Sequence, residues 1–297
     1  DQRGAIVEVN AGPGLLMHLK PASGEPRPVG QAIVEHLFHD GDSGRIPIVG
    51  ITGSKGKTTV AHLVTSILQL GHQFTGLACS DGLYFSRMHA EKSDCANWAA
   101  AHRVLLNRAV QAAVIENSSR VILTEGLAYD RCQVGVVTNI DPAALLPELF
   151  IEDAEQLAKV FRTQVDVVLP DGVAVLNAED TIVSSLAPLC DGTVIFFGLD
   201  GTAPTITEHR AQGGRAVFVR DSHIMLAQGP EESVLAELFD IPLTEAGQRP
   251  LQVANVLAAA GAAWALGIAP DLIRAGLETF GCQPAESAVA SVAASIE

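Results

Sequence analysis

The sequence predicts an α/β fold with a largely parallel β-sheet. Short, continuously apolar runs rich in β-branched residues recur along the chain, as expected of strands that are buried on both faces. Segments with apolar residues at helical spacing lie between several of these runs. A glycine-rich loop joins one run to the helical segment that follows it. This alternation of strands and helices is typical of α/β proteins.

The N-terminal part is predicted to contain a strand and a helix. Ala5–Asn10 is an apolar run with strand character, and Val29–Phe38 has the pattern of a helix. Residues 39–44 have the composition of a linker. The first strand is preceded by neither an initiator Met nor a signal peptide. We therefore interpret the chain as part of a longer polypeptide.

The rest of the chain predicts the elements of the sheet. A strand over Arg45–Thr52 precedes a helix over Thr58–Leu70, which Gly71 ends at the C′ position. Shorter alternating runs from Ile206 to Ala227, around Gln212–Arg215, predict antiparallel hairpins. Further strands, largely parallel, are predicted over Phe74–Cys79, Ala112–Glu116, Val134–Ile140, Val173–Asn177 and Thr193–Gly198. Further helices are predicted over Cys95–Arg108, Asp153–Val168, Ala178–Leu189, Gln252–Leu266 and Pro270–Thr279.

The composition excludes several classes of protein. The chain has 297 residues, of which 48% are hydrophobic, so it can bury a sizeable core. This length corresponds to about two domains. The 34 acidic residues exceed the 19 basic ones, and the formal net charge is −15. Because no basic surplus exists to neutralise phosphates, we expect neither nucleic acid nor a membrane as a partner. Local cations and backbone amides can still hold a nucleotide.

The cysteines and histidines indicate a reduced, cytoplasmic protein without structural zinc. The 5 cysteines are an odd number and form no C-x-x-C pair. The 9 histidines lack the spacing of zinc ligands.

Leu251–Ala269 carries no charge, but it is rich in Ala and Gly and contains Gln252 and Asn255. We therefore expect a buried helix there and not a membrane span.

The glycine-rich loop has the features of a phosphate-binding loop, or P-loop. It lies within Gly50–Thr59, between a predicted strand and a predicted helix. Glycines let backbone amides turn toward phosphate, and the helix N-terminus adds the positive end of a dipole. Lys57 is placed to reach the β- and γ-phosphates, and the Thr58 hydroxyl to bind Mg²⁺. We predict that ATP and Mg²⁺ bind here, through Gly53, Ser54, Lys55, Gly56, Lys57, Thr58 and Thr59.

The form of this loop resembles that of the Mur ligase superfamily. The spacing G-x-x-x-x-G-K-[ST] would need glycine at Ile51, whereas Thr52–Thr59 reads Thr-Gly-Ser-Lys-Gly-Lys-Thr-Thr. Three other stretches resemble the same superfamily, namely Val136–Ile140, Val173–Asp180 and Ala254–Gly267. The resemblance implies an enzyme that makes an acyl phosphate from a carboxylate and ATP, which an amine then attacks. It also implies Asn255 as a nucleotide contact and Glu116 as a metal ligand.

A second resemblance narrows the family. Val7–His18 is similar to the end of an ATP-grasp domain, in which a Glu-x-Asn pair binds Mg²⁺. On a strand, Glu8 and Asn10 would share a face and hold one ion between them. An ATP-grasp end followed by a Mur-like module resembles cyanophycin synthetase. Other stretches similar to that family are Asp81–Tyr84, Glu91–Cys95, Tyr129–Cys132 and Asp240–Thr244. The resemblance implies that the ATP-grasp domain adds Asp to a poly-aspartate backbone and the Mur-like domain adds Arg to the Asp side chain.

Several positions depart from the family pattern. Ala143 and Ala144 stand where the family has Asp and His, and methyl groups cannot bind a metal. The family's lysine, carbamylated in many Mur ligases, aligns with Phe161, although Lys159 lies close to it. Of the His-Asn-x-x-Asn nucleotide motif only Asn255 remains. We also expect the third Mur domain to be absent. These losses predict that amide ligation in this module is abolished, while ATP binding survives.

These observations lead to one interpretation and two alternatives. The predicted domains are residues 1–40 (the end of an ATP-grasp domain and a linker), residues 41–284 (the Mur-like domain) and residues 285–297 (a tail). We interpret the chain as part of an ATP-dependent amide ligase resembling the shortened second type of cyanophycin synthetase, which joins β-aspartyl-arginine dipeptides at its ATP-grasp site. Its Mur-like module would be degenerate, with a structural or oligomerising role in a homo-oligomer. No catalytic residue is assigned to this module.

The two alternatives place the function in the Mur-like module itself. In the first, the module is an active Mur-type ligase that adds an amino acid such as Arg to an Asp side chain. In the second, it is a nucleotide-binding regulatory domain. The sequence leaves open which amino acid, dipeptide or polymer is the substrate, because selectivity in this family depends on other regions.

Overall fold

The structure is a computed structural model that describes residues 9, 12, 14–38 and 44–281 of the chain. The chain is divided into two compact units, Asp1–Arg45 and Ile46–Glu297. The predicted Mg²⁺ ligands Glu8 and Asn10 lie outside the described residues, and so does the tail 285–297. Of the predicted strand Ala5–Asn10, only Val9 is described.

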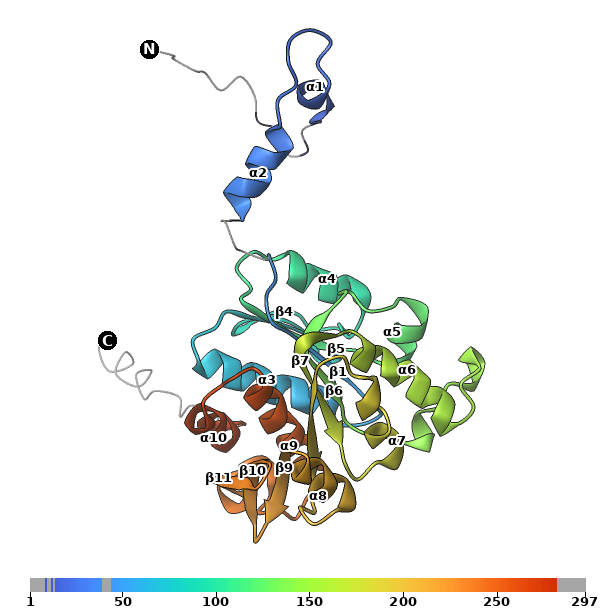
Figure 1. Cartoon of the computed structure of the whole chain (residues 1–297), viewed down its shortest axis with the longest axis vertical. Helices are drawn as coiled ribbons and strands as arrows, with labels where there is room; N and C mark the ends of the chain where they lie inside the picture. Colours follow the sequence, from blue (N-terminus) through green and yellow to red (C-terminus); the bar gives the residue numbers. More distant parts are fainter. Residues whose placement is uncertain (1–8, 10–11, 13, 39–43, 282–297) are drawn as a thin grey trace, which may run out of the picture. The chain divides into compact units, whose positions relative to one another are not determined.

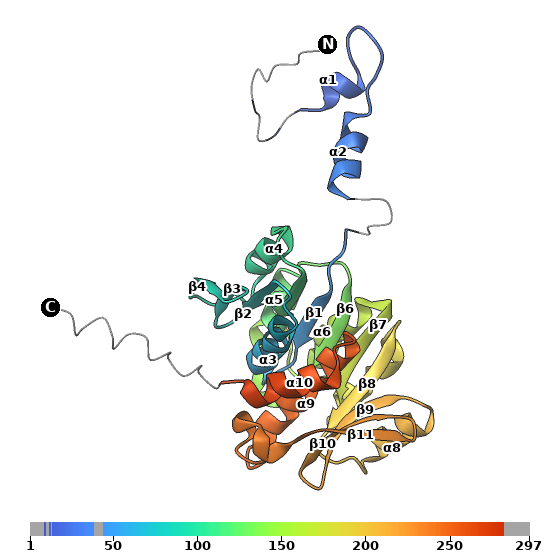
Figure 2. The same ribbon diagram turned by 90° about the vertical axis from the view of Figure 1, so that its left-hand side faces the viewer.

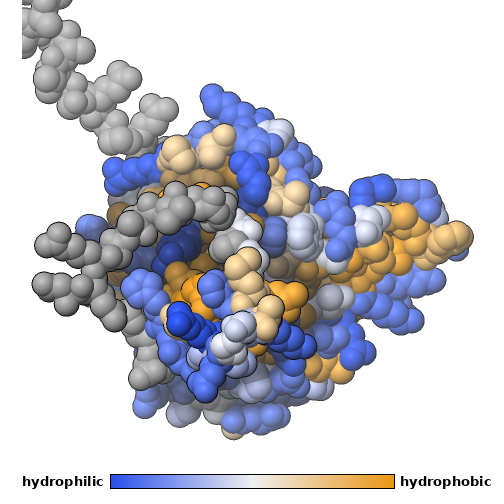
Figure 3. Space-filling model, turned by 90° about the horizontal axis from the view of Figure 1, so that it is seen from above, coloured by the Kyte–Doolittle hydropathy of each residue, from blue (hydrophilic) through white to orange (hydrophobic). Residues whose placement is uncertain are grey.

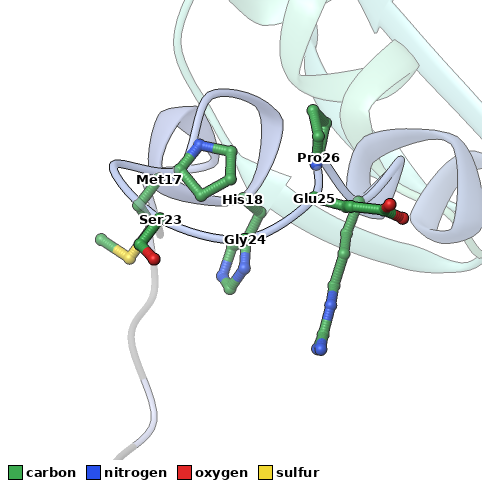
Figure 4. Close-up of a pocket in the computed structure, with 8 residues that line it drawn as sticks. Met17, His18, Ser23, Gly24, Glu25 and Pro26 are labelled. Atoms are coloured by element: carbon green, nitrogen blue, oxygen red, sulfur yellow. The ribbon is translucent and has the colours of Figure 1, made fainter.

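The first unit contains two short helices, α1 (Leu16–Leu19) and α2 (Val29–Leu37). The predicted helix over Val29–Phe38 is thereby confirmed. Neither helix has a buried residue. Between them the chain turns back, and the Arg27 amide donates a 2.8 Å hydrogen bond to the His18 carbonyl. This turn surrounds a hollow of about 430 Å³, around which Met17, His18 and Glu25 are seen in Figure 4.

The second unit is built on an 11-stranded sheet within the described residues. Its strand order is β11-β10-β9-β8-β7-β6-β1-β5-β2-β3-β4. The strands from β9 to β2 in this order pair in parallel, and two antiparallel strands extend each edge. The bounds are β1 Ile48–Thr52, β2 Thr75–Cys79, β3 Gly82–Phe85, β4 Met88–Glu91, β5 Ala112–Glu116, β6 Cys132–Val137, β7 Val168–Asn177, β8 Thr193–Gly198, β9 Arg215–Arg220, β10 His223–Gln228 and β11 Glu231–Glu237. The prediction of an α/β fold with a largely parallel sheet is confirmed.

Helices cover both faces of this sheet, which makes three layers (Figures 1 and 2). One face packs against α3, α9 and α10, and the other packs against α4, α6, α7 and α8. The central strands are buried on both faces because each face has its own helical layer, which explains their continuous apolar runs. The helices are α3 Lys57–Leu70, α4 Trp98–Leu106, α5 Ser119–Thr124, α6 Ala154–Asp166, α7 Thr181–Ser184, α8 Pro204–Ala211, α9 Pro250–Ala265 and α10 Pro270–Thr279.

Three sequence predictions need correction. Gly71 does not end α3 in a left-handed conformation, since its φ is −75° and His72 takes that role with φ 60°. The predicted helix over Ala178–Leu189 is interrupted: α7 is one turn long, and a separate 3₁₀ turn contains Pro188. Proline lacks the amide hydrogen that would continue an α-helix.

The third correction concerns the predicted hairpins around Gln212–Arg215. That segment ends helix α8 and enters β9, which pairs in parallel with β8. The hairpin lies further along the chain, between β9 and β10, where Asp221 and Ser222 turn the chain with φ values of 48° and 63°. Such a turn needs positive φ at both central residues, which glycine provides most easily, so Asp-Ser gave a weak signal in the sequence.

The uncharged segment Leu251–Ala269 is a buried helix, as predicted. It forms α9, in which residues 255–263 are all buried, and it packs under the sheet beside α3. Within the described ranges, we find no helix with the length and hydropathy needed to cross a membrane. On the face drawn in Figure 3, hydrophilic side chains are interrupted by hydrophobic patches.

The packing of α6 on β6 generates a stability prediction. A Cβ atom on Gly135 would lie 2.7 Å from the Gln164 carbonyl oxygen and 2.8 Å from Val168 Cγ2. The nearest of these atoms belongs to the backbone of α6, which cannot move aside as a side chain can. We therefore expect Gly135→Ala to lower the free energy of unfolding by about 1–3 kcal/mol. Urea denaturation measures this change.

Gly198→Ala is the matched control for that measurement. A Cβ on Gly198 would meet Ile206 Cδ1 at 3.3 Å, and this methyl group ends a flexible side chain. We expect its free energy of unfolding to change by less than about 1 kcal/mol, because this side-chain atom can shift by a few tenths of an ångström. Equal losses in the two variants would contradict the packing described for α6.

Candidate functional site

The glycine-rich loop connects β1 to α3 and can be built only with glycine at two positions. Gly53 has φ 128° and Gly56 has φ 87°, in the region that favours glycine. A Cβ on Gly53 would overlap the Thr138 hydroxyl, and a Cβ on Gly56 would overlap the Asn255 side-chain oxygen. The loop therefore lies in direct contact with the chain after β6 and with α9.

Hydrogen bonds from residues 138–141 hold this loop in place. The Lys55 amide donates to Asn139 Oδ1 at 3.0 Å, and Asn139 Nδ2 donates to the Lys55 carbonyl at 3.0 Å. Thr138 Oγ1 donates to the same carbonyl at 2.7 Å. The Ser54 amide donates to the Asn139 carbonyl at 2.9 Å. The amides of Ser54 and Lys55 are thus engaged within the protein and are not free to bind a ligand.

The next four amides remain available as hydrogen-bond donors. In the part of the chain that the structure describes, the amides of residues 56–59 have no acceptor. Gly56 precedes α3, and the other three residues form its first turn, so these donors point out of the helix N-terminus. Together with the helix dipole they form a site suited to an anion.

The two lysines of the loop differ in their surroundings. Lys57 Nζ lies 3.4 Å from the Ser54 carbonyl oxygen, and the residue is half-buried. Burial lowers the pKa of Lys57, although the charges of Glu116 and Asp94 partly oppose this shift. Lys55 is half exposed and forms an ion pair with Asp141. Lys57 therefore has the less hydrated charge and a stronger electrostatic interaction with any bound anion.

Three oxygen-bearing side chains meet at the carboxyl edge of the sheet. Glu116 ends β5 and is only 4% exposed. Its carboxylate accepts hydrogen bonds from Thr58 Oγ1 at 3.0 Å and from the Ser80 amide at 3.0 Å. The Ser80 hydroxyl lies 2.8 Å from Thr58 Oγ1. The structure thus brings the predicted ligands Thr58 and Glu116 together.

This cluster is suited to a Mg²⁺ ion that a bound phosphate would also coordinate. Mg²⁺ prefers oxygen ligands and is commonly held by one or two carboxylates together with phosphates and water. The cluster offers one carboxylate and two hydroxyl groups. Among the described residues, no group of three or more His, Cys, Asp and Glu side chains could enclose a metal by itself. Thr58 and Glu116 would hold the ion, which would supply charge neutralisation to a bound phosphate.

The departures from the family pattern are visible as local structure. Ala143 and Ala144 lie in the 3₁₀ turn Pro142–Ala144, which Asp141 caps with a 2.8 Å hydrogen bond to the Ala143 amide. Phe161 is completely buried in the layer between α6 and the sheet. Lys159 is exposed on the outer side of α6. Neither position on α6 directs a lysine amine to the loop.

Asn255 lies against the loop, but it is only 2% exposed. Its Nδ2 donates to Gln252 Oε1 at 3.1 Å, and its oxygen faces Gly56. Its predicted role as an ATP contact stays a prediction.

The sequence analysis did not select three residues of the site, Ser80, Thr138 and Asn139. Ser80 directly follows β2, and Thr138 and Asn139 are the first two residues after β6, but only the strand order shows that these strand ends adjoin the loop.

The sequence matches the family model of the Mur ligase middle domain over residues 51–263. The chain belongs to this family. It is 36% identical to a cyanophycin synthetase of Synechocystis sp. over 280 residues, which are 94% of this chain and 32% of that protein. It is 27% identical to a UDP-N-acetylmuramoyl-L-alanyl-D-glutamate–2,6-diaminopimelate ligase of Gloeobacter violaceus over 254 residues, 83% of this chain and 48% of that one. The chain thus spans about a third of the length of the cyanophycin synthetases that it matches.

Solved structures of two other ligases have the same fold. A UDP-N-acetylmuramoyl-L-alanyl-D-glutamate–2,6-diaminopimelate ligase superposes with a TM-score of 0.60 at 16% identity, covering 80% of this chain and 47% of that one. A pseudomurein peptide ligase type C from Methanothermus fervidus gives a TM-score of 0.53 at 20% identity, covering 82% and 51%. The resemblance to the Mur ligase superfamily and to cyanophycin synthetase is confirmed.

The two hydrogen bonds between Asn139 and Lys55 of the loop lead to a prediction. Asn139→Ala removes the acceptor of the Lys55 amide and the donor to the Lys55 carbonyl. We expect local opening of the loop to become about thirtyfold more frequent, because two hydrogen bonds of roughly 1 kcal/mol each are lost. Amide hydrogen exchange at Lys55 measures this opening.

The Thr138 amide is the internal control, since it donates to the Thr52 carbonyl at 3.0 Å within the same region. Its exchange rate should stay unchanged in Asn139→Ala. Unchanged exchange at Lys55 would show that Asn139 does not hold the loop.

Proposed function

We propose that this chain binds ATP with Mg²⁺ at the loop between β1 and α3. The observation that carries the proposal is the set of four amides at residues 56–59 that have no acceptor among the described residues, together with the ammonium group of Lys57 in the same segment. Backbone amides at a helix N-terminus bind phosphate oxygens, and a lysine charge stabilises the terminal phosphates. Thr58 and Glu116 supply oxygen ligands for Mg²⁺ at the same end of the helix. Gly53, Ser54, Lys55 and Thr59 belong to the same proposed site, with Asn255 against Gly56.

We further propose that the chain is part of an ATP-dependent amide ligase of the cyanophycin synthetase kind. Its relatives of that name support this assignment. The reaction would transfer the γ-phosphoryl group of ATP to a carboxylate and release ADP. An amine would then attack the acyl carbon and release phosphate. The substrates would be aspartate and arginine units or their dipeptides, and the enzyme would be a cytoplasmic homo-oligomer.

In this proposal, amide formation belongs to an ATP-grasp site and not to the Mur-like module. Residues 1–40 would be the end of the ATP-grasp domain, with Glu8 and Asn10 as its Mg²⁺ ligands, and residues 41–284 would form the Mur-like domain before the tail 285–297. The support is the loss of polar groups that the family pattern has at three positions. Ala143 and Ala144 offer only methyl groups, and Phe161 is enclosed in the core. The module would bind ATP while contributing to structure and assembly.

The second candidate function is an active Mur-type ligase. The contact between Thr58, Ser80 and Glu116 favours it, because a metal site shared with a nucleotide would remain intact. In this case the module itself would join an amino acid such as Arg to an Asp side chain. A nucleotide-binding regulatory domain is the third candidate and would show binding without turnover.

The two lysines of the loop provide a matched test of nucleotide binding. We expect Lys57→Ala to weaken binding of a non-hydrolysable ATP analogue at least tenfold, because it removes the half-buried charge of the loop. Lys55→Ala should weaken binding less than about threefold, because Lys55 is half exposed and paired with Asp141. Isothermal titration calorimetry measures both affinities. Equal affinity of wild type and Lys57→Ala would reject the proposed site.

The location of amide formation is tested in the intact polypeptide. We expect Lys57→Ala to leave the rate of product formation nearly unchanged, since the competent site would lie elsewhere. Changing Glu8 or Asn10 to Ala should abolish it, because these residues would hold the Mg²⁺ of that site. The assay compares amide product formed per enzyme, with assembly checked by light scattering. Loss of product in a folded, assembled Lys57→Ala enzyme would favour the second candidate.

A further inference from the structure

Three buried polar side chains form a network beneath the loop. Asn117 Nδ2 donates to Tyr129 Oη at 2.8 Å and to Gln164 Oε1 at 3.0 Å. Tyr129 Oη in turn donates to Gln164 Oε1 at 2.8 Å. The exposed fractions of the three residues are 3%, 7% and 0%. Polar groups so deeply buried are costly unless they are bonded, and here each of the three residues bonds the other two.

The network is packed against the strand that leads into the loop. A Cβ atom on Gly50 would overlap Tyr129 Oη and would lie 2.5 Å from both Nε2 and Oε1 of Gln164. Glycine on β1 thus makes room for the network. Burial raises the pKa of Tyr129 well above its usual value, so its hydroxyl stays protonated and keeps its role as a donor.

The backbone connects this network to Glu116. Asn117 directly follows Glu116, and its amide donates to the Ile51 carbonyl at 2.8 Å. Its own carbonyl accepts a 2.9 Å hydrogen bond from Thr52 Oγ1. Successive residues of an extended chain point to opposite faces of a sheet. Asn117 therefore bonds α6 on one face, while Glu116 meets Thr58 of α3 on the other.

We infer that Asn117, Tyr129 and Gln164 are positioning residues for Glu116, and that through it they set the affinity of the proposed site for Mg²⁺. The inference rests on the proposed nucleotide site. The network fixes the backbone at the point where β5 ends, and this backbone fixes the direction of the Glu116 carboxylate. Partners that orient a metal ligand without touching the metal commonly change metal affinity by about 10–100-fold when they are removed.

Tyr129→Phe tests the inference, because it removes one hydroxyl group and leaves the aromatic ring in place. The readout is the magnesium enhancement, defined as the dissociation constant of a non-hydrolysable ATP analogue in EDTA divided by that in MgCl₂. We expect wild type to show a clear enhancement and Tyr129→Phe to lower it about tenfold. The affinity in EDTA should change less than twofold, because the free amides and Lys57 are untouched. Calorimetry with the 297-residue chain measures each constant.

Two further variants keep the test decisive. Gln164→Met keeps the length of the side chain and removes both of its polar groups, so it should lower the magnesium enhancement as Tyr129→Phe does. Thr65→Val is the control, because it removes another buried hydroxyl group, whose 2.8 Å hydrogen bond to the Ala61 carbonyl lies within α3. It should leave the enhancement unchanged. Circular dichroism melting identifies any variant that fails to fold.

The outcomes separate this inference from the proposed function. If wild type binds the analogue with an enhancement that Tyr129→Phe and Gln164→Met both retain, the network serves only the stability of the fold and the inference is overturned. An equal loss of affinity in EDTA and in MgCl₂ would also overturn it, because the whole loop would then have moved. If wild type does not bind the analogue under either condition, the proposed function itself fails.

Discussion

The site depends on the close contact between the β1–α3 loop and the chain that follows β6. Gly53 and Gly56 lack the Cβ atoms that would overlap Thr138 and Asn255, so the loop can approach both. Thr138 Oγ1 and Asn139 Nδ2 then donate hydrogen bonds to the Lys55 carbonyl, and Asn139 Oδ1 accepts one from the Lys55 amide. Once these groups are occupied, the amides of residues 56–59 are the ones left to face a ligand. The loop is thus held in shape before anything binds, which lowers the entropic cost of binding.

The same strand edge unites the other parts of the site. In a parallel sheet the carboxyl ends of neighbouring strands meet at one edge. The order β6-β1-β5-β2 therefore places Thr138 and Asn139, the loop, Glu116 and Ser80 side by side there. Residues that are far apart in sequence therefore share one site. The helices on the two faces play different parts: α3 presents the amides and Thr58, while α6 supports the strand ends from the opposite face through Gln164.

The sequence predicted the central strands well and the edges poorly. Ala112–Glu116 is buried at every position and Thr193–Gly198 from Ile195 onward, so continuous apolar runs mark both strands in the sequence. Strand β11 at one edge is mostly exposed, including Val234, and only Leu235 and Ala236 are buried, so its pattern in the sequence is weak. Strand β4 at the other edge has only four residues, a length at which a pattern is hard to detect. Short and half-exposed strands are specified mainly by their neighbours.

The predicted site shows a similar division. Lys57, Thr58 and the two loop glycines belong to one contiguous motif, so spacing alone was enough to select them. Glu116 needed its place at a strand end and the resemblance to a family. Ser80 and Asn139 join the site only through strand order, which a single sequence does not contain. The polar network of Asn117, Tyr129 and Gln164 spans 47 residues of sequence between its ends and has no motif by which it could be recognised.

The central claim is that the free amides of residues 56–59, with Lys57, hold the phosphates of ATP while Thr58 and Glu116 hold Mg²⁺. A crystal structure of the chain with a non-hydrolysable ATP analogue and Mg²⁺ tests it most directly. The account predicts phosphate oxygens within hydrogen-bond distance of these amides and of Lys57 Nζ. It also predicts a cation bound to the Thr58 hydroxyl and the Glu116 carboxylate. Phosphates bound away from this loop, or a cation that contacts neither Thr58 nor Glu116, would contradict it.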